Sequence, residues 1–335
     1  MPARPAVALR QVSVLDRHRG SWFLDRVAAF ESHHVETSAS LPATELADPR
    51  YQDIDAWPPA AALAALFEAQ LAAAAATRAA LPGIEWAVAA SLERLQAGGR
   101  LIYAGAGTSG RLAAQDAAEL IPTFDWPAER LVLLIAGGRA ALLDAVENAE
   151  DDADAARRAI NDHAVGTADV VIGVAASGRT PFTCAVLAES ASRGALTIAV
   201  ANSAATPLLA LAAHPILVET GAEPVAGSTR LKAGTAQKIV LNLFSTLLML
   251  RLGRVHRGLM IDLRASNAKL RARALRMLRH LTGAEAAPAE AALAEAAGSV
   301  KIAVLLLRGL DRASARTLLD RHQGDLRAAL ATLPP

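Results

Sequence analysis

Residues 100–111 read R-L-I-Y-A-G-A-G-T-S-G-R, and they combine a strand, a loop and a helix start. The apolar run 101–103 predicts a strand, the glycines at 105, 107 and 110 predict a tight loop, and a helical pattern begins at Leu112. A helix that starts from such a loop directs its free N–H groups and the positive end of its dipole toward the loop. The loop is therefore suited to bind an anion, most simply a phosphate, with Thr108 and Ser109 as additional hydroxyl donors.

The same spacing fits the G-x-G-x-x-G pattern of dinucleotide-binding proteins. Such a site needs an acidic residue at the end of the next strand to hold the ribose. Here the predicted strand 131–135 runs into Ala136-Gly137-Gly138, and Asp125 and Glu129 both precede it. A second hydroxyl-rich loop, Ser177-Gly178-Arg179-Thr180, follows further along the chain. Two hydroxyl loops favour a small phosphorylated ligand over a nicotinamide or flavin cofactor.

The composition is that of a soluble globular protein, with 53% hydrophobic and 20% charged residues in 335. A net charge of +1 gives no overall attraction to nucleic acid or to an anionic membrane. The single cysteine, Cys184, excludes an internal disulfide, is expected to be a core residue of a helix, and suits a reducing cytoplasm. We expect no membrane span, because the most apolar run, 239–252, contains Asn242 and Arg251.

Five apolar segments alternate with helical patterns, at 101–104, 131–135, 169–175, 196–200 and 215–218. Segment 169–175 is almost wholly apolar, as a parallel strand buried on both faces should be. This alternation predicts an α/β fold, a doubly wound parallel five-stranded sheet flanked by helices. Ligands bind beyond the carboxyl ends of the strands in such sheets, where both hydroxyl loops fall.

The helical patterns complete the expected layout. Helices are predicted at 60–77 and 84–96, from the first loop to about 120 with Pro122 as a stop, at 140–148, and after the segment 228–238 to about 252. Only helical patterns follow residue 267, which predicts a small C-terminal helical module. We therefore expect a loosely attached extension (1–40), a catalytic sheet domain with N-terminal helices (41–265) and the helical module (266–335).

Hydroxyl and basic residues are the candidates for phosphate contacts. Ser109, Ser177 and Thr180 could bind phosphate or, alternatively, cap helices. Arg230, Lys232 and Lys238 could supply positive charge or simply form a solvated helix start. The histidines, including His163, lack cysteine or carboxylate neighbours at metal spacing, so we expect no metal site.

Three carboxylates are candidates for proton transfer. Glu119 lies near a helix C-terminus, where a negative charge is unfavourable by a few tenths of a kcal/mol. Glu147 and Glu150 are three residues apart and are expected to share a helical face with Asp144. These acids could form a solvated surface, but two carboxylates in a cleft are what acid–base chemistry on a sugar requires.

Several long motifs occur together in a fixed order. They are G-A-G-T-S-G-R at 105–111, A-E-x-x-P-T-F at 118–124, I-A-G-G at 135–138, A-V-E-N-A-E-D-D at 145–152, A-A-S-G-R-T-P at 175–181 and G-S-T-R-L-K-A-G-T-A-Q-K at 227–238. From about Thr44 to the C-terminus, the chain resembles the N-acetylmuramic acid 6-phosphate etherases of the sugar isomerase (SIS) superfamily.

The resemblance implies a cytoplasmic homodimeric lyase of peptidoglycan amino-sugar recycling, with an SIS fold and no cofactor. It would release D-lactate from N-acetylmuramic acid 6-phosphate and leave N-acetylglucosamine 6-phosphate. Glu119 matches the family's acid/base glutamate, Glu150 matches the second catalytic glutamate, as C2 base or helper in ring opening, and Glu147 would support them. The implied substrate- and phosphate-binding residues are Thr108, Ser109, Gly110, Ser177, Gly178, Arg179, Thr180, Ser228 and Lys232.

Two other functions remain open at the level of sequence. The glucokinase regulatory protein shares these motifs and is a non-catalytic sugar-phosphate sensor, and sugar-phosphate isomerases of the superfamily also use a carboxylate base. The chain departs from the etherase motifs at Asp48, Leu120, Ile121 and Gly258, which leaves fine substrate specificity open. The sequence also leaves open which glutamate is the C2 base and which protomer completes each active site.

Overall fold

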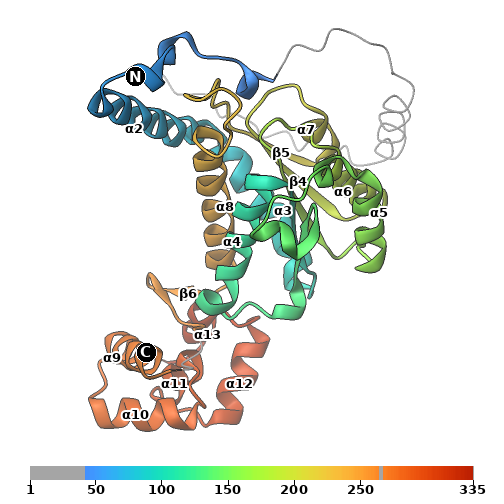
Figure 1. Ribbon diagram of the computed structural model, residues 1–335. Coiled ribbons are helices and arrows are strands. Elements are labelled where there is room, and N and C mark those ends of the chain that lie inside the picture. Colours follow the sequence, from blue (N-terminus) through green and yellow to red (C-terminus); the bar gives the residue numbers. More distant parts are fainter. Residues whose placement is uncertain (1–41, 264–266, 335) are drawn as a thin grey trace, which may run out of the picture. The chain divides into compact units, whose positions relative to one another are not determined.

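The computed structural model describes residues 42–263 and 267–334. At its centre lies a parallel sheet with the strand order β2-β1-β3-β4-β5 (Figure 1). The strands are β1 (Leu101–Gly105), β2 (Leu131–Ile135), β3 (Val170–Val174), β4 (Leu196–Ala201) and β5 (His214–Leu217). The predicted parallel five-stranded sheet is confirmed, and the strand ends differ from the expected bounds by one residue at most.

Side chains of the central strands alternate between two hydrophobic cores. In β1, Leu101 and Tyr103 belong to one core, whereas Ile102 and Ala104 belong to the other. The first core is covered by α3 (Leu81–Gln96), α4 (Gly107–Phe124) and α8 (Lys232–Arg251), and the second by α5 (Ala153–Asp162), α6 (Pro181–Ser192) and α7 (Pro207–Leu211) (Figure 1). Because helices cover both faces, the central strands β1 and β3 are buried at every position.

Helix α2 (Pro59–Ala76) packs against α8 and not against the sheet. Two helical stretches, residues 59–96 and α8, are long and apolar enough to cross a membrane by length and composition alone. This differs from the sequence expectation, and in residues 59–96 the many alanines account for the apolar composition. In the fold, 56% of the apolar window of α8 is buried within the protein, but only 17% of that of residues 59–96.

The prediction that Pro122 ends the helix after the first loop is wrong. Helix α4 includes Pro122 and ends beyond it, where Asp125 adopts a left-handed conformation with φ of 50°. Proline lacks the N–H that would bond the carbonyl of Ala118, four residues earlier. Ala118 and Pro122 are both exposed, so water can satisfy that carbonyl and the helix continues.

The predicted helix at 140–148 is also wrong. The chain forms a short 3₁₀ helix, η6 (Gly138–Leu142), and is irregular until a second one, η7 (Ala149–Asp151). The Arg111 guanidinium donates to the carbonyl oxygen of Asp144 at 3.0 Å, and this contact fixes the irregular path. Consequently, the acidic residues expected on one helical face do not share one.

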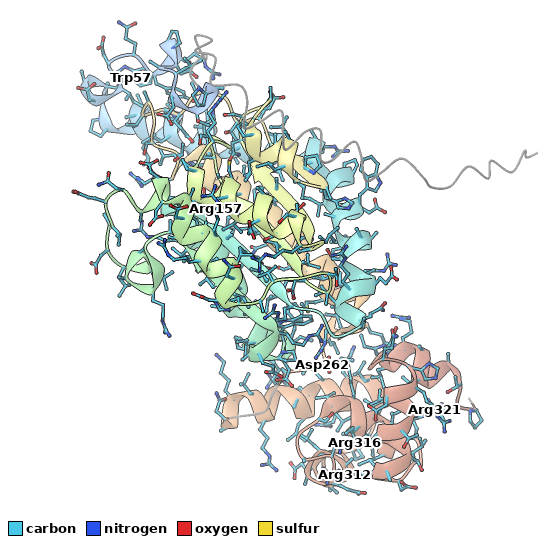
Figure 2. The ribbon with its side chains drawn as sticks, turned by 90° about the vertical axis from the view of Figure 1, so that its right-hand side faces the viewer. Trp57, Arg157, Asp262, Arg312, Arg316 and Arg321 are labelled. Atoms are coloured by element: carbon cyan, nitrogen blue, oxygen red, sulfur yellow. The ribbon has the colours of Figure 1, made fainter. Side chains whose placement is uncertain are left out.

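The C-terminal part forms its own hydrophobic core. It begins after a ribbon of β6 (Val255–His256) and β7 (Leu259–Met260) and comprises α9 (Ala268–Thr282), α10 (Ala286–Glu295), α11 (Val300–Leu306), α12 (Arg312–Arg321) and α13 (Leu326–Ala331). Asp262, labelled in Figure 2, connects this core to the end of α8 through Lys301 (2.7 Å) and Arg254 (3.3 Å). The helical module is therefore present, whereas its boundary at 266 stays a prediction and the extension 1–40 lies outside the described residues.

Candidate functional site

A cavity of about 430 Å³ lies at the carboxyl ends of β1 and β3. These strands are neighbours in the sheet although β2 lies between them in sequence, so the strand order reverses here. Ligands of open α/β sheets bind at this kind of position. The cavity is lined by Glu45, Ala106, Gly107, Thr108, Ser109, Glu150, Asp151, Ala176, Ser177, Arg179, Thr180, Pro181, Gly227 and Thr229. Both predicted hydroxyl loops therefore meet in one cavity.

The first loop brings β1 and α4 into very close contact. A Cβ added at Gly110 would lie 2.8 Å from the Gly105 carbonyl oxygen, so this approach requires glycine. The N-cap of α4 is Ala106, whose methyl group cannot cap. Since helix capping does not use the hydroxyls of Thr108 and Ser109, they are available to a ligand together with the free N–H groups of the first turn. Gly110 shapes the loop and does not line the cavity.

The second loop is built in a similar way before α6. Thr180 is the N-cap of α6, but its side chain makes no capping hydrogen bond within the described residues. The Ser177 hydroxyl accepts a hydrogen bond from the Arg179 N–H at 3.2 Å, which holds the turn. Gly178 has φ of +63°, and a Cβ there would lie 2.3 Å from the Thr206 hydroxyl. Gly178 therefore permits the turn, while its three neighbours line the cavity.

Three carboxylates reach the same cavity. Glu150 and Asp151 come from η7, and Glu45 comes from a 3₁₀ turn before α2. One carboxylate oxygen of Glu45 lies 3.1 Å from the position that a Cβ on Gly227 would take. Sequence reasoning missed Glu45 as a site residue, although it belongs to the Thr44-Glu45 motif that resembles the etherases.

Glu119 and Glu147 lie elsewhere. Glu119 is exposed on α4, ten residues after Ser109, which is about 15 Å along the helix axis. Glu147 lines a separate cavity of about 650 Å³ beside β2. Within one chain, the structure therefore brings Glu150, but not Glu119, to the hydroxyl loops.

The loop before α8 contributes Gly227 and Thr229, whereas the predicted residues Ser228 and Lys232 do not line the cavity. The buried Lys232 ammonium donates to the Ala222 carbonyl at 2.7 Å, and burial lowers the pKa of Lys232. The Ser228 N–H donates to the carbonyl of the nearby Val225 at 2.9 Å. Both residues therefore act in the loop's own structure in this chain.

Glu223 fixes the start of α8. Its carboxylate is fully buried and accepts hydrogen bonds from the N–H groups of Lys232 (2.8 Å) and Ala233 (2.9 Å). Burial raises the pKa of Glu223, and these two bonds oppose that effect. Sequence reasoning missed Glu223, because no local pattern joins it to a helix that begins nine residues later.

Two further features bear on the chemistry of the chain, namely the thiol of Cys184 and the grouping of side chains that could bind a metal ion. Cys184 lies in α6 as a buried core residue, and burial raises the pKa of its thiol to about 11. Within residues 42–263 and 267–334, no group of three His, Cys, Asp or Glu side chains is close enough to hold a metal ion.

Comparison with known proteins identifies the family. The sequence matches the glucokinase regulatory protein N-terminal SIS domain over residues 84–191 and the SIS domain over residues 152–247. An N-acetylmuramic acid 6-phosphate etherase of Deinococcus radiodurans is 50% identical over 288 residues, which cover 86% of this chain and 94% of that protein. The chain belongs to the N-acetylmuramic acid 6-phosphate etherase family.

A second curated relative agrees with this placement. An etherase of the same name from Streptomyces avermitilis is 44% identical over 306 residues, or 90% of this chain and 98% of that protein. A solved phosphoheptose isomerase from Francisella tularensis is 18% identical, with a TM-score of 0.46 over 58% of this chain and 100% of that chain. The etherase family and the SIS domain expected from the motifs are thus confirmed.

Proposed function

We propose that this protein is a carbon–oxygen lyase that cleaves the D-lactyl ether of N-acetylmuramic acid 6-phosphate. The products would be N-acetylglucosamine 6-phosphate and D-lactate, in cytoplasmic recycling of cell-wall amino sugars. Relatives at 44–50% identity carry the name of this activity. The observation that supports it most in the structure is that the two hydroxyl loops and Glu150 line one cavity.

The 6-phosphate of the substrate would bind between the two loops. The N-termini of α4 and α6 both begin there, so their free N–H groups and positive dipole ends favour a dianion. Thr108, Ser109, Ser177 and Thr180 add hydroxyl donors, and Arg179 adds a positive charge. The cavity lies within the range of about 300–1,000 Å³ that is usual for small-ligand sites.

The bound sugar would react in its ring-opened form. The C1 aldehyde acidifies the C2 proton, which Glu150 removes. The electron pair forms the C2–C3 double bond, the bond from C3 to the ether oxygen breaks, and Glu119 donates a proton to the leaving lactate oxygen. Water then adds at C3 and a proton returns to C2, so both carboxyl groups regain their starting states. Each such proton transfer contributes about 10²–10⁴-fold to the rate.

Glu119 would come from a second copy of the chain. It lies about 15 Å along α4 from the loop of its own chain, which is too far for the lactyl ether of a sugar held there by its phosphate. A surface for the second copy is available on α2, where Leu63, Phe67 and Leu71 are 69%, 62% and 54% exposed at four-residue spacing. We therefore propose a homodimer whose active sites combine residues of both protomers.

Release of D-lactate from N-acetylmuramic acid 6-phosphate tests the proposal. The wild-type protein should release lactate without added cofactor, and Glu150→Gln should lose about 10²–10⁴-fold of the rate. Asp154→Asn, which changes an exposed carboxylate paired with Arg157, is the matched control and should keep the rate. Binding of the sugar phosphate without turnover would indicate a sensor, and interconversion of hexose phosphates would indicate an isomerase. Either result would contradict the proposal.

A further inference from the structure

Asp116 is a buried carboxylate that the reaction described above does not use. Its side chain accepts hydrogen bonds from the Tyr103 hydroxyl (2.9 Å), the Asn242 amide (2.8 Å) and the Ser245 hydroxyl (3.0 Å). Burial raises the pKa of Asp116, and the three hydrogen bonds oppose that effect. Apolar residues of similar size would fill this position at a lower cost in folding free energy. The presence of a carboxylate here therefore indicates a function.

The Asp116 carboxylate fixes the side chain of Asn242, and Asn242 holds Lys238. The amide nitrogen of Asn242 donates to the Asp116 carboxylate. The amide oxygen of Asn242 therefore points away from that carboxylate. That oxygen accepts a hydrogen bond from the Lys238 ammonium. An exposed lysine on a helix usually moves freely. Here the Lys238 ammonium donates to Asn242, and Asn242 donates in turn to the buried carboxylate of Asp116.

The Lys238 ammonium and Glu119 lie at similar levels along two helices that pack against each other. Helices α4 and α8 run in parallel, because Gly234 lies against Leu112 and Asn242 bonds to Asp116 further along both helices. Glu119 follows Leu112 by two helical turns, and therefore also lies along the contact with α8. Since Asn242 holds the ammonium near the level of Asp116, the ammonium is about one turn, or about 5 Å, from the level of Glu119.

The stretches of α4 and α8 that carry this pair contain few other charges. Residues 112–122 of α4 and 236–250 of α8 contain three charged side chains, Asp116, Glu119 and Lys238. Leu243 and Leu250 of α8 are exposed apolar neighbours. Charges interact more strongly where apolar groups displace water, as would happen under a partner subunit.

We propose that Lys238 binds the carboxylate of the lactyl group of the substrate, with Asn242 and Asp116 as positioning residues. This inference rests on the proposed etherase function. The lactyl carboxylate is attached to the carbon that bears the ether oxygen, so the group that binds it must lie close to the group that protonates that oxygen. The Lys238 ammonium neutralises the carboxylate and takes no part in the proton transfers. It would thereby select sugar phosphates that carry the lactyl ether.

Two ligands that differ only by the lactyl group test this role in the full-length protein. Lys238→Gln should lower kcat/KM for N-acetylmuramic acid 6-phosphate by about 10- to 100-fold, the size of one hydrogen bond to a charged group. The inhibition constant of N-acetylglucosamine 6-phosphate, which lacks the lactyl group, should stay within about twofold, since it makes no contact with Lys238. Lys238→Arg should recover part of the loss because it keeps the charge.

Variants along the network separate positioning from stability. Asn242→Ala should lower the same kcat/KM and add little to Lys238→Gln in the double variant. Ser192→Ala removes an exposed hydroxyl that bonds the Glu189 carbonyl outside this network, so it should leave the ratio for the two ligands unchanged. Equal weakening of both ligands, or no change for either, would overturn the role of Lys238. Absence of lactate release by the wild-type protein would instead overturn the etherase function itself.

Discussion

Ser109 and Ser177 carry the phosphate assignment at the scale of single residues. Their hydroxyls line one cavity, and neither caps its helix. Replacing both by alanine should weaken binding of N-acetylglucosamine 6-phosphate by about 10²- to 10⁴-fold, as expected for two lost hydrogen bonds to a charged group. Titration calorimetry measures this directly. Ser192→Ala, which removes an exposed hydroxyl that bonds the Glu189 carbonyl, is the control. Unchanged affinity in the double variant would show that the loops do not hold the phosphate.

A second prediction at the scale of single residues concerns Glu223. Glu223→Ala leaves two N–H groups at the start of α8 without their acceptor and should lower the free energy of unfolding by about 2–3 kcal/mol. Glu223→Gln keeps one acceptor oxygen and should lose less. Urea unfolding provides both values. Equal stability of the alanine variant and the wild type would mean that the bonds to Lys232 and Ala233 contribute nothing.

The sequence predicts residues well where local pattern and function coincide. The hydroxyl loops are recognisable because glycines, Thr108 and Ser109 directly follow an apolar strand. Glu223 and Asp116 are not recognisable, because their partners lie far along the chain and meet them only in the folded protein. The local sequence pattern likewise could not show that Ser228 and Lys232 lie outside the lining of the cavity.

At the scale of elements, Arg100 and Asp169 tie the starts of β1 and β3 together. The guanidinium of Arg100 donates to both carboxylate oxygens of Asp169, at 2.9 and 2.7 Å. Burial opposes ionisation of Asp169, but the bonds from Arg100 and the Gly166 N–H outweigh it and lower the pKa below its ordinary value of 3.8. The folded state therefore binds fewer protons than the unfolded state. This contribution to stability is present above pH 3.8 and is lost as the pH falls through the lower folded pKa.

Asp169→Asn should consequently be less stable than the wild type at pH 7, by about 2–3 kcal/mol for a largely buried charge pair. Because the variant has no carboxyl to protonate, the difference should shrink as the pH falls below 3.8. Chemical unfolding at a series of pH values measures it. A difference that stays constant with pH would contradict the lowered pKa of Asp169.

Elements follow the sequence when their own pattern fixes them. The five strands are mostly apolar runs, and their predicted bounds are nearly those observed. The helix predicted at 140–148 does not form, since a distant side chain, Arg111, takes up backbone carbonyls there. The short helix α7 has too few residues to show a helical period, and sequence reasoning missed it.

At the scale of the whole molecule, the apolar stripe on α2 should join two copies of the chain. Phe67→Glu places a charge in the middle of that stripe and should convert a dimer into monomers. Light scattering after size-exclusion chromatography gives the mass of each form. The monomer should also lose lactate release, because Glu119 no longer reaches the partner's cavity. A wild-type monomer, or a wild-type protein that binds phospholipid vesicles through α2, would contradict this assignment.

We propose that each active site combines residues of two protomers. Mixing two inactive variants is the decisive test of this arrangement. Glu119→Gln and Glu150→Gln homodimers should each release almost no D-lactate. When the two variants are unfolded and refolded together, half of the dimers contain one chain of each kind, and one of their two sites has both glutamates intact. The mixture should therefore recover about a quarter of wild-type D-lactate release, as the dimer symmetry requires. A mixture that stays as inactive as its components, in confirmed mixed dimers, would contradict the shared site.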